Sequence, residues 1–178
     1  GNAIIDISNK NAFIALFPKA QMSIANVIVN NSSSTGLVER LYYAYINDKI
    51  VIWYEINDGG SSTTNMICLN NKNNKIAWKQ EIPGFNLCRP LYSEKYIYYA
   101  CIGTVGKVDF ETGQIVWSHD DLYINSDKLK AGFNAFSSIY IESNSIVFVE
   151  GDKQKHLGKK RIIFVDKITG KISEIKVQ

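Results

Sequence analysis

One short segment combines the side-chain types that acid–base or metal chemistry requires. His119 is followed directly by Asp120 and Asp121, a set that could bind a metal ion or move a proton. The carboxylates and amides that follow lack the alternating ligands, the glycine and the final glutamate of a calcium loop. The sequence also contains no nucleophile elbow, no glycine-rich phosphate loop and no recurring pair of carboxylates. We therefore expect a solvated loop cap here, and no catalytic residue, metal ligand or cofactor in the chain.

The three cysteines, Cys68, Cys88 and Cys101, are too few and too odd in number for a disulfide framework. If Glu94 and Lys95 form the turn of a hairpin over 87–102, Ser93 faces Tyr96 and Cys88 faces Cys101. Two states stay open for this pair: a cross-strand disulfide, or two buried thiols that act as small hydrophobic side chains, which we favour.

A basic run over residues 153–161 (KQKHLGKKR) lies between two expected strands. Such a run could contact an anionic partner, but no aromatic residues are interleaved to stack on bases. It is equally typical of a soluble loop that protects an edge strand. The whole chain carries 20 basic and 17 acidic residues, a net charge of +3. This balance and the lack of a long apolar run predict neither a nucleic-acid partner nor a membrane span.

A repeated unit of strands has to position these side chains. The segments 66–78 (MICLNNKNNKIAW) and 105–117 (VGKVDFETGQIVW) align at an offset of 39 residues, and residues 163–174 continue the series. Each copy reads as a strand, a polar turn and a second strand. The turn is Asp-x-x-Thr-Gly, in which the Asp accepts backbone N–H groups and the Gly takes a positive φ. These repeat residues are Asp109, Thr112 and Gly113, then Asp166, Thr169 and Gly170; Asn70 and Asn74 replace the Asp and Gly in the first copy.

A second hairpin motif alternates with the first, in the segments 45–54, 91–100 and 140–149. A set of four strands that recurs about every 40 residues is typical of the blades of a β-propeller. We predict a single all-β domain over 1–178, made of antiparallel four-stranded blades in a small or incomplete propeller-like stack of sheets. The clear repeats cover 37–178, whereas 1–36 is irregular with one extra hairpin around residues 8–11. A short helix fits only 121–131.

The segment 107–117 (KVDFETGQIVW) resembles the Ala-x-Asp-x-x-Thr-Gly-x-x-x-Trp signature of the pyrroloquinoline-quinone (PQQ)-like propeller repeats. It departs from the signature only at Lys107, while Glu174 stands where the third copy should have its Trp. The resemblance implies blades that pack through Trp78 and Trp117, which we expect in the core. It covers about 66–177 and leaves function open, because dehydrogenases, assembly scaffolds and sensor domains share the repeat. A full propeller of this type has six to eight blades, so the chain forms a small closed ring, an open stack or a piece that completes itself by association.

Tyrosines crowd two of the hairpins, and strand alternation sends some of them outward. Exposed tyrosines beside an arginine would form a protein-binding patch, although half-exposed cross-strand ladders would explain them equally well. The irregular insertion at 120–132 is a second candidate surface. The candidate interaction residues are Arg40, Tyr43, Tyr54, Arg89, Tyr98, Asp120, Asp121 and Tyr123.

These observations favour a non-catalytic protein-interaction module with another protein as its partner, and they allow self-association. A bacterial toxin-neutralising immunity protein or an assembly scaffold would fit the size. The alternative is a ligand-binding or quinoprotein-like enzyme domain. The sequence opens without a secretory signal. We therefore expect one of two locations: the cytoplasm, or the periplasm or the outside of the cell after a leader has been removed.

Overall fold

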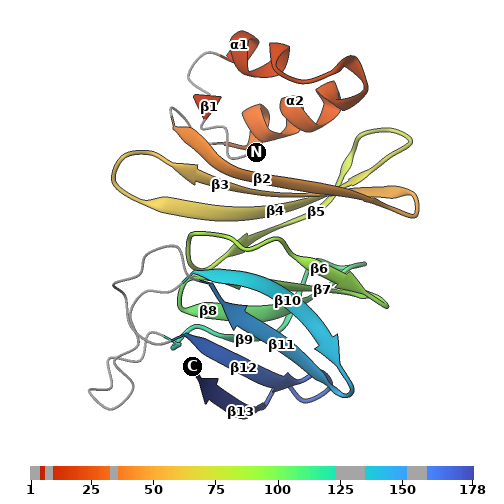
Figure 1. Ribbon diagram of the computed structural model, residues 1–178. Helices are drawn as coiled ribbons and strands as arrows, with labels where there is room; N and C mark the ends of the chain where they lie inside the picture. The colour runs from red at the N-terminus through yellow and green to blue at the C-terminus, as the bar shows by residue number, and fades with distance from the viewer. Residues whose placement is uncertain (1–4, 7–9, 33–35, 123–134, 152–159) are drawn as a thin grey trace. The chain divides into compact units, whose positions relative to one another are not determined.

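The computed structural model describes residues 5–6, 10–32, 36–122, 135–151 and 160–178. Its contacts divide the chain into two compact units, residues 1–82 and 83–178. Each unit is built mainly of antiparallel strands, as the repeat predicts (Figure 1). No described helix is both long and apolar enough to cross a membrane.

The first unit contains one antiparallel sheet in the order β1-β2-β3-β4-β5. Short turns join its neighbouring long strands, and the register of β2 with β3 contains a bulge after Val38. β1 pairs with β2 only through Leu37 and Val38, so the described part of β2 beyond the bulge has a sheet neighbour on one side alone. The strands are β1 (Ile5–Asp6), β2 (Leu37–Ile46), β3 (Lys49–Asn57), β4 (Ser62–Asn70) and β5 (Ile76–Ile82).

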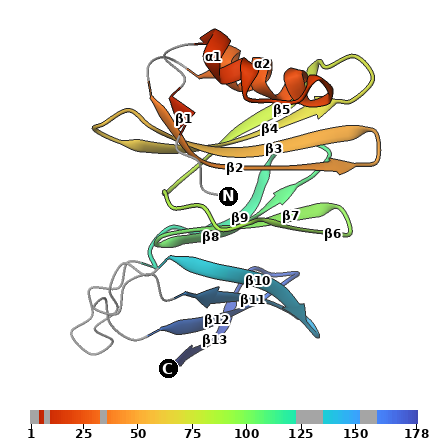
Figure 2. The same cartoon turned by 45° about the horizontal axis from the view of Figure 1, so that its top comes forward.

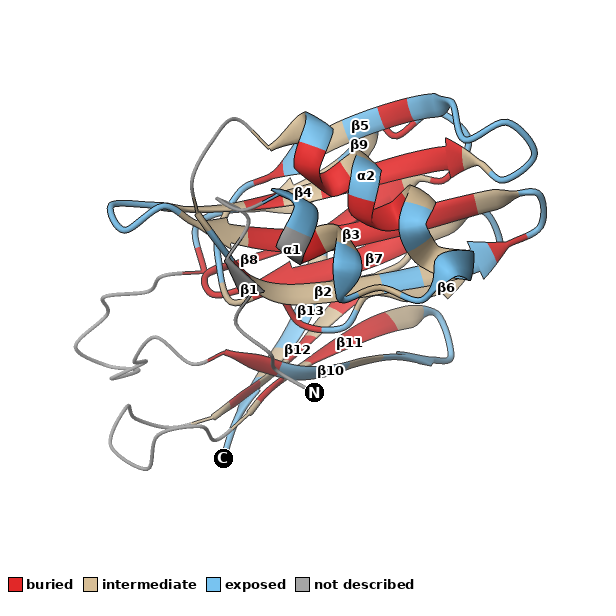
Figure 3. Ribbon diagram, turned by 90° about the horizontal axis from the view of Figure 1, so that it is seen from above, coloured by how far each residue is buried: buried red, intermediate tan, exposed pale blue. Residues whose placement is uncertain are grey.

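Helices replace the hairpin that we expected near the start of the chain. They are α1 (Lys10–Ala15), the 3₁₀ turn η1 (Lys19–Gln21) and α2 (Met22–Asn31). α2 buries Ile24, Ala25, Ile28 and Val29, which recur with the period of a helix and form one stripe. This stripe and Phe13 of α1 pack on one face of the sheet, which Figures 2 and 3 show beneath the helices. Burial against the sheet therefore outweighs the strand preference of the β-branched residues in α2.

The second unit contains two four-stranded antiparallel sheets whose facing sides share one hydrophobic core. Phe148 and Ile163 of one sheet and Tyr98 and Val105 of the other belong to this core. The first sheet consists of β6 (Leu91–Ser93), β7 (Tyr96–Cys101), β8 (Thr104–Asp109) and β9 (Ile115–His119); the second consists of β10 (Phe136–Glu142), β11 (Ser145–Glu150), β12 (Arg161–Asp166) and β13 (Ile172–Val177).

The repeated turns form as the sequence predicts. Asp109 Oδ1 accepts the backbone N–H of Thr112 at 3.0 Å and its hydroxyl at 3.1 Å, and Gly113 has φ 74°. The same bonds join Asp166 to Thr169 at 2.7 and 2.9 Å, and Gly170 has φ 72°. These bonds hold the pKa of the Asp166 carboxyl below its usual value. Residue types and spacing alone were sufficient for these turns, because the bonds are local.

The asparagine version of the turn is also confirmed. Asn70 Oδ1 accepts the N–H of Lys72 at 2.9 Å, and Asn74 has a positive φ of 55°. In the hairpin of the second motif that joins β6 and β7, Ser93 pairs with Tyr96 around the expected turn at Glu94.

Candidate functional site

Two of the blade sheets interlock through Trp117 and Gly170. The Trp117 ring on β9 lies 6.4 Å from the Phe148 ring on β11, in an edge-to-face arrangement. A Cβ atom added to Gly170 would lie only 2.6 Å from Trp117 Cγ, so the indole sits directly on this turn. His119 Nε2 is 2.6 Å from the Gly170 carbonyl oxygen, a hydrogen bond that belongs to the same contact. Trp117 is partly buried and packs against the core that these two sheets share, and Trp78 is buried in the first unit.

Lys107, the one residue that departs from the repeat signature in its segment, also joins the two sheets. Lys107 is 5% exposed, and its Nζ donates to the Lys167 carbonyl oxygen at 2.7 Å. The ammonium also lies 3.7 Å from the centre of the Tyr96 ring. Burial lowers the pKa of Lys107.

Tyr43 is exposed on β2, as a protein-binding residue has to be. Tyr43 is 37% exposed and Tyr45 is 51% exposed, and their rings make an edge-to-face contact with centroids 6.2 Å apart. Tyr43 is opposite Ile52 and Tyr45 is opposite Ile50, so both tyrosines lie on the helix-covered face of the sheet. The candidate residues did not include Tyr45, although its position two residues after Tyr43 places it on the same face. We call Tyr43 and Tyr45 the tyrosine pair.

Two candidate interaction residues are corrected by their burial. Tyr54 is 1% exposed, because it points from β3 into the core beneath the helices. Tyr98 is 3% exposed, because it lies in the core between the two sheets of the second unit, 6.4 Å from the Trp117 ring. Burial raises the pKa of Tyr98 to about 12. The aromatic pattern could not distinguish these inward residues from the outward ones.

The remaining candidates are distributed over both units. Arg40 lies on the opposite face of the sheet, opposite Glu55, and its Nε is 3.7 Å from the buried Glu55 Oε2. Arg89, Asp120 and Asp121 are exposed in loops of the second unit. Tyr123 and most of the 120–132 insertion, including nearly all of the expected 121–131 helix, lie outside the described residues.

Cys68, Cys88 and Cys101 are all buried thiols, and β6 begins only after Cys88. Most of the basic run lies outside the described residues, and Arg161 is not a surface charge. Its side chain is buried and donates from Nε to Glu150 Oε1 at 3.0 Å. In the described part of the chain, no three His, Cys, Asp or Glu residues are grouped as metal ligands.

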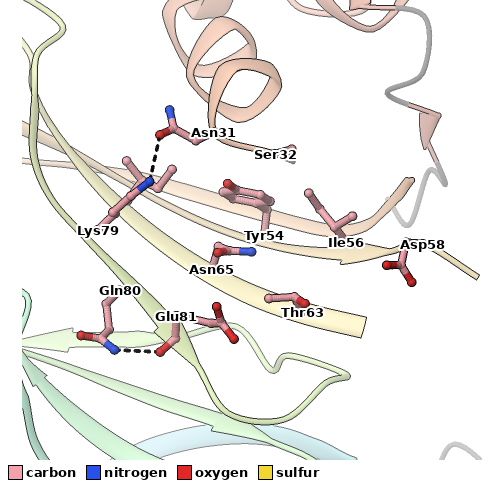
Figure 4. Close-up of a pocket in the computed structure, with 11 residues that line it drawn as sticks. Asn31, Ser32, Tyr54, Ile56, Asp58, Thr63, Asn65, Lys79, Gln80 and Glu81 are labelled. Atoms are coloured by element: carbon pink, nitrogen blue, oxygen red, sulfur yellow. Dashed lines mark hydrogen bonds between the residues drawn. The ribbon is translucent and has the colours of Figure 1, made fainter. Parts of the chain in front are cut away.

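A polar cavity of about 390 Å³ lies on the helix-covered face of the first sheet, beside the end of α2 (Figure 4). The side chains of Tyr54, Asn65 and Glu81 form one row across it, since these residues are opposite one another on β3, β4 and β5. The other lining residues are Asn31, Ser32, Ile56, Asp58, Thr63, Ile67, Lys79 and Gln80. We call this the α2 cavity.

A charged side chain that forms local hydrogen bonds lies at each end of the α2 cavity. Asp58 Oδ1 accepts the N–H groups of Gly60 at 3.1 Å and Ser61 at 2.9 Å, which lowers the pKa of this carboxyl. At the other end, Lys79 Nζ donates to Asn31 Oδ1 at 3.5 Å. Sequence reasoning missed the cavity because α2 forms one of its walls and was not expected. The alternation of polar and apolar residues on β5 was the only available signal.

The sheets are blades of the β-propeller type, and comparison of the fold agrees. The chain superposes on the quinohemoprotein alcohol dehydrogenase ADHIIG from Pseudomonas putida HK5 with a TM-score of 0.54 and 16% identity. The match covers 76% of this chain and 20% of the dehydrogenase, so the chain spans about a fifth of that protein's length. At this identity the likeness shows the fold alone.

Two further structures are similar at lower scores. BamB from Moraxella catarrhalis has a TM-score of 0.45 and 16% identity, over 76% of this chain and 47% of BamB. A bifunctional GH43-CE protein from Bacteroides eggerthii has a TM-score of 0.44 and 13% identity, over 83% of this chain and 20% of that protein. No family model and no curated protein matches the sequence.

Proposed function

We propose that this chain is a non-catalytic protein-binding module built from PQQ-like propeller repeats, and that it binds its partner through the tyrosine pair. The observation that carries the proposal is the exposure of two adjacent tyrosines on β2, whereas Tyr54, Tyr98 and Tyr99 are buried. Aromatic residues that are exposed and already ordered by mutual contact are typical of binding hot spots.

The position of the tyrosine pair on β2 supports an extended partner segment. Beyond Val38, β2 has one sheet neighbour among the described residues, namely β3. Backbone groups on such an edge can pair with an incoming strand, and the tyrosine rings would contact alternate side chains of that strand. An immunity protein and an assembly scaffold would each need a surface that binds another protein, and the identity of the partner would distinguish the two roles.

The test uses the double variant Tyr43→Ala/Tyr45→Ala, with Tyr140→Ala as the matched control. Tyr140 is 41% exposed on β10, so its removal tests for a general effect of losing a surface tyrosine. We expect a protein from the native host that binds wild type and the control equally and the double variant at least about tenfold more weakly. Binding of that purified protein should then be measured by titration calorimetry.

If every bound protein retains full affinity for the double variant, the tyrosine pair is not the binding surface. Turnover of an alcohol after addition of pyrroloquinoline quinone, measured with a dye as electron acceptor, would instead support the quinoprotein-like enzyme and overturn the non-catalytic part of the proposal.

A further inference from the structure

We propose that the α2 cavity is a second binding site, which takes a guanidinium or ammonium group carried on an aliphatic stem. The inference goes beyond the protein-binding function, because the cavity uses none of the residues of the tyrosine pair. The charges, the hydrogen-bonding capacity and the apolar floor of the cavity favour such a ligand.

The formal charges of the lining favour a cation. Asp58 and Glu81 contribute two carboxylates, and Lys79 contributes one ammonium. The ammonium is hydrogen-bonded to Asn31 at one end, and the turn bonds keep Asp58 ionised. The net charge of the lining is therefore negative, which repels a carboxylate or phosphate and attracts a cation.

Polar side chains of the cavity lining supply the acceptors that a guanidinium needs. The side chains of Thr63, Asn65 and Glu81 form no hydrogen bond within the described part of the chain, so their oxygen atoms can accept one from a ligand. A guanidinium has five N–H donors and no acceptor, and an ammonium has three donors. Such a group can therefore use several of these acceptors together, whereas an anion cannot.

The shape of the site suits the stem of the ligand. Ile56 and Ile67 are apolar members of the lining, on the neighbouring strands β3 and β4. Long cationic side chains place their methylene groups on apolar surface and their charged end in polar surroundings. A cavity of about 390 Å³ is large enough for one such side chain.

The probe is acetyl-arginine amide, with acetyl-citrulline amide as the matched control, because citrulline has nearly the same shape without the charge. We expect saturable binding of the arginine probe with a Kd of about 1 mM, measured by amide chemical shifts or calorimetry. The citrulline probe should bind about tenfold more weakly. Glu81→Gln should weaken the arginine probe about five-fold, since Glu81 is exposed and its charge is partly screened. Tyr43→Ala/Tyr45→Ala should leave the affinity unchanged.

Two further probes, agmatine and an Arg-containing tripeptide, distinguish a free small molecule from a peptide side chain as the source of the cation. If agmatine binds as tightly as the arginine probe, the ligand is a free small molecule; if an Arg-containing tripeptide binds more tightly, it is a side chain of a peptide. Equal binding of citrulline, tighter binding of acetyl-glutamate amide, or no binding of any probe at 10 mM, about ten times the expected Kd, would each overturn the proposal. Loss of binding in the tyrosine double variant would instead show that the two sites are one.

Discussion

Substitution of Gly170 by Ala tests whether the Trp117 contact holds the two blades of the second unit together. The new Cβ would lie 2.6 Å from Trp117 Cγ and 2.8 Å from Cδ1, so the indole or the turn has to move. The backbone at φ +72° adds a cost of about 1–2 kcal/mol for any residue with a Cβ. Overpacking of a tight core adds about 1–3 kcal/mol. We therefore expect the free energy of unfolding to fall by about 2–5 kcal/mol.

Gly59→Ala separates the two contributions. Gly59 also has a positive φ, +86°, but no heavy atom lies within 4 Å of the Cβ that alanine would add. This variant should lose only the backbone part, about 1–2 kcal/mol. Both values are measured by urea unfolding followed by far-ultraviolet circular dichroism.

A double-mutant cycle within the second unit completes the test. Trp117→Leu shortens the side chain that Gly170 contacts, so Gly170→Ala should cost about 1–2 kcal/mol in that background. If Gly170→Ala costs the same in both backgrounds, and no more than Gly59→Ala, the blades do not depend on the indole packing against this turn.

Three further predictions concern stability. The pKa of Tyr98 is raised to about 12 in the folded chain, so between pH 10 and pH 12 the unfolded chain loses the phenol proton while the folded chain keeps it. The contribution of this proton to stability is therefore complete below pH 10, and the free energy of unfolding should fall by about 1.4 kcal/mol per pH unit up to pH 12. Tyr98→Phe should reduce this slope in urea unfolding. Glu150→Ala should cost about 3–5 kcal/mol because it leaves the buried Arg161 charge unpaired, whereas the double variant Glu150→Met/Arg161→Met should unfold close to wild type in the same assay. Phe13→Ala should cost about 3–5 kcal/mol and reduce the protection of α2 amides in hydrogen exchange, because Phe13 is fully buried beside that helix; unchanged protection would show that α2 docks without it.

The strands and turns of the blades could be predicted from the sequence because the residues that determine them are close together in the chain. An Asp and a Thr three residues apart determine a turn, and strand alternation on either side determines the register. The helices were not predicted, since Ile24, Val27, Ile28 and Val29 favour strands and only packing on the sheet makes them helical. The α2 cavity was not predicted for the same reason, because α2 forms one of its walls.

The tyrosines show the same division between local and distant information. Alternation predicts that neighbouring tyrosines point to opposite faces, but not which face another element covers. Tyr43 and Tyr54 lie on the same face of one sheet, and only the position of the helices makes one exposed and the other buried.

Lys107 has a consequence for how similar repeats find their correct neighbours during folding. Chains with repeated units can assemble in the wrong order, because each copy offers nearly the same apolar surface. The Tyr96 ring belongs to the same sheet as Lys107, whereas the Lys167 carbonyl oxygen belongs to the second sheet. Against a sheet with no acceptor at this place, the buried ammonium would lose that hydrogen bond, at a cost of about 1.5–3 kcal/mol. The residue that breaks the repeat signature thus favours the pairing of blades that supplies this acceptor.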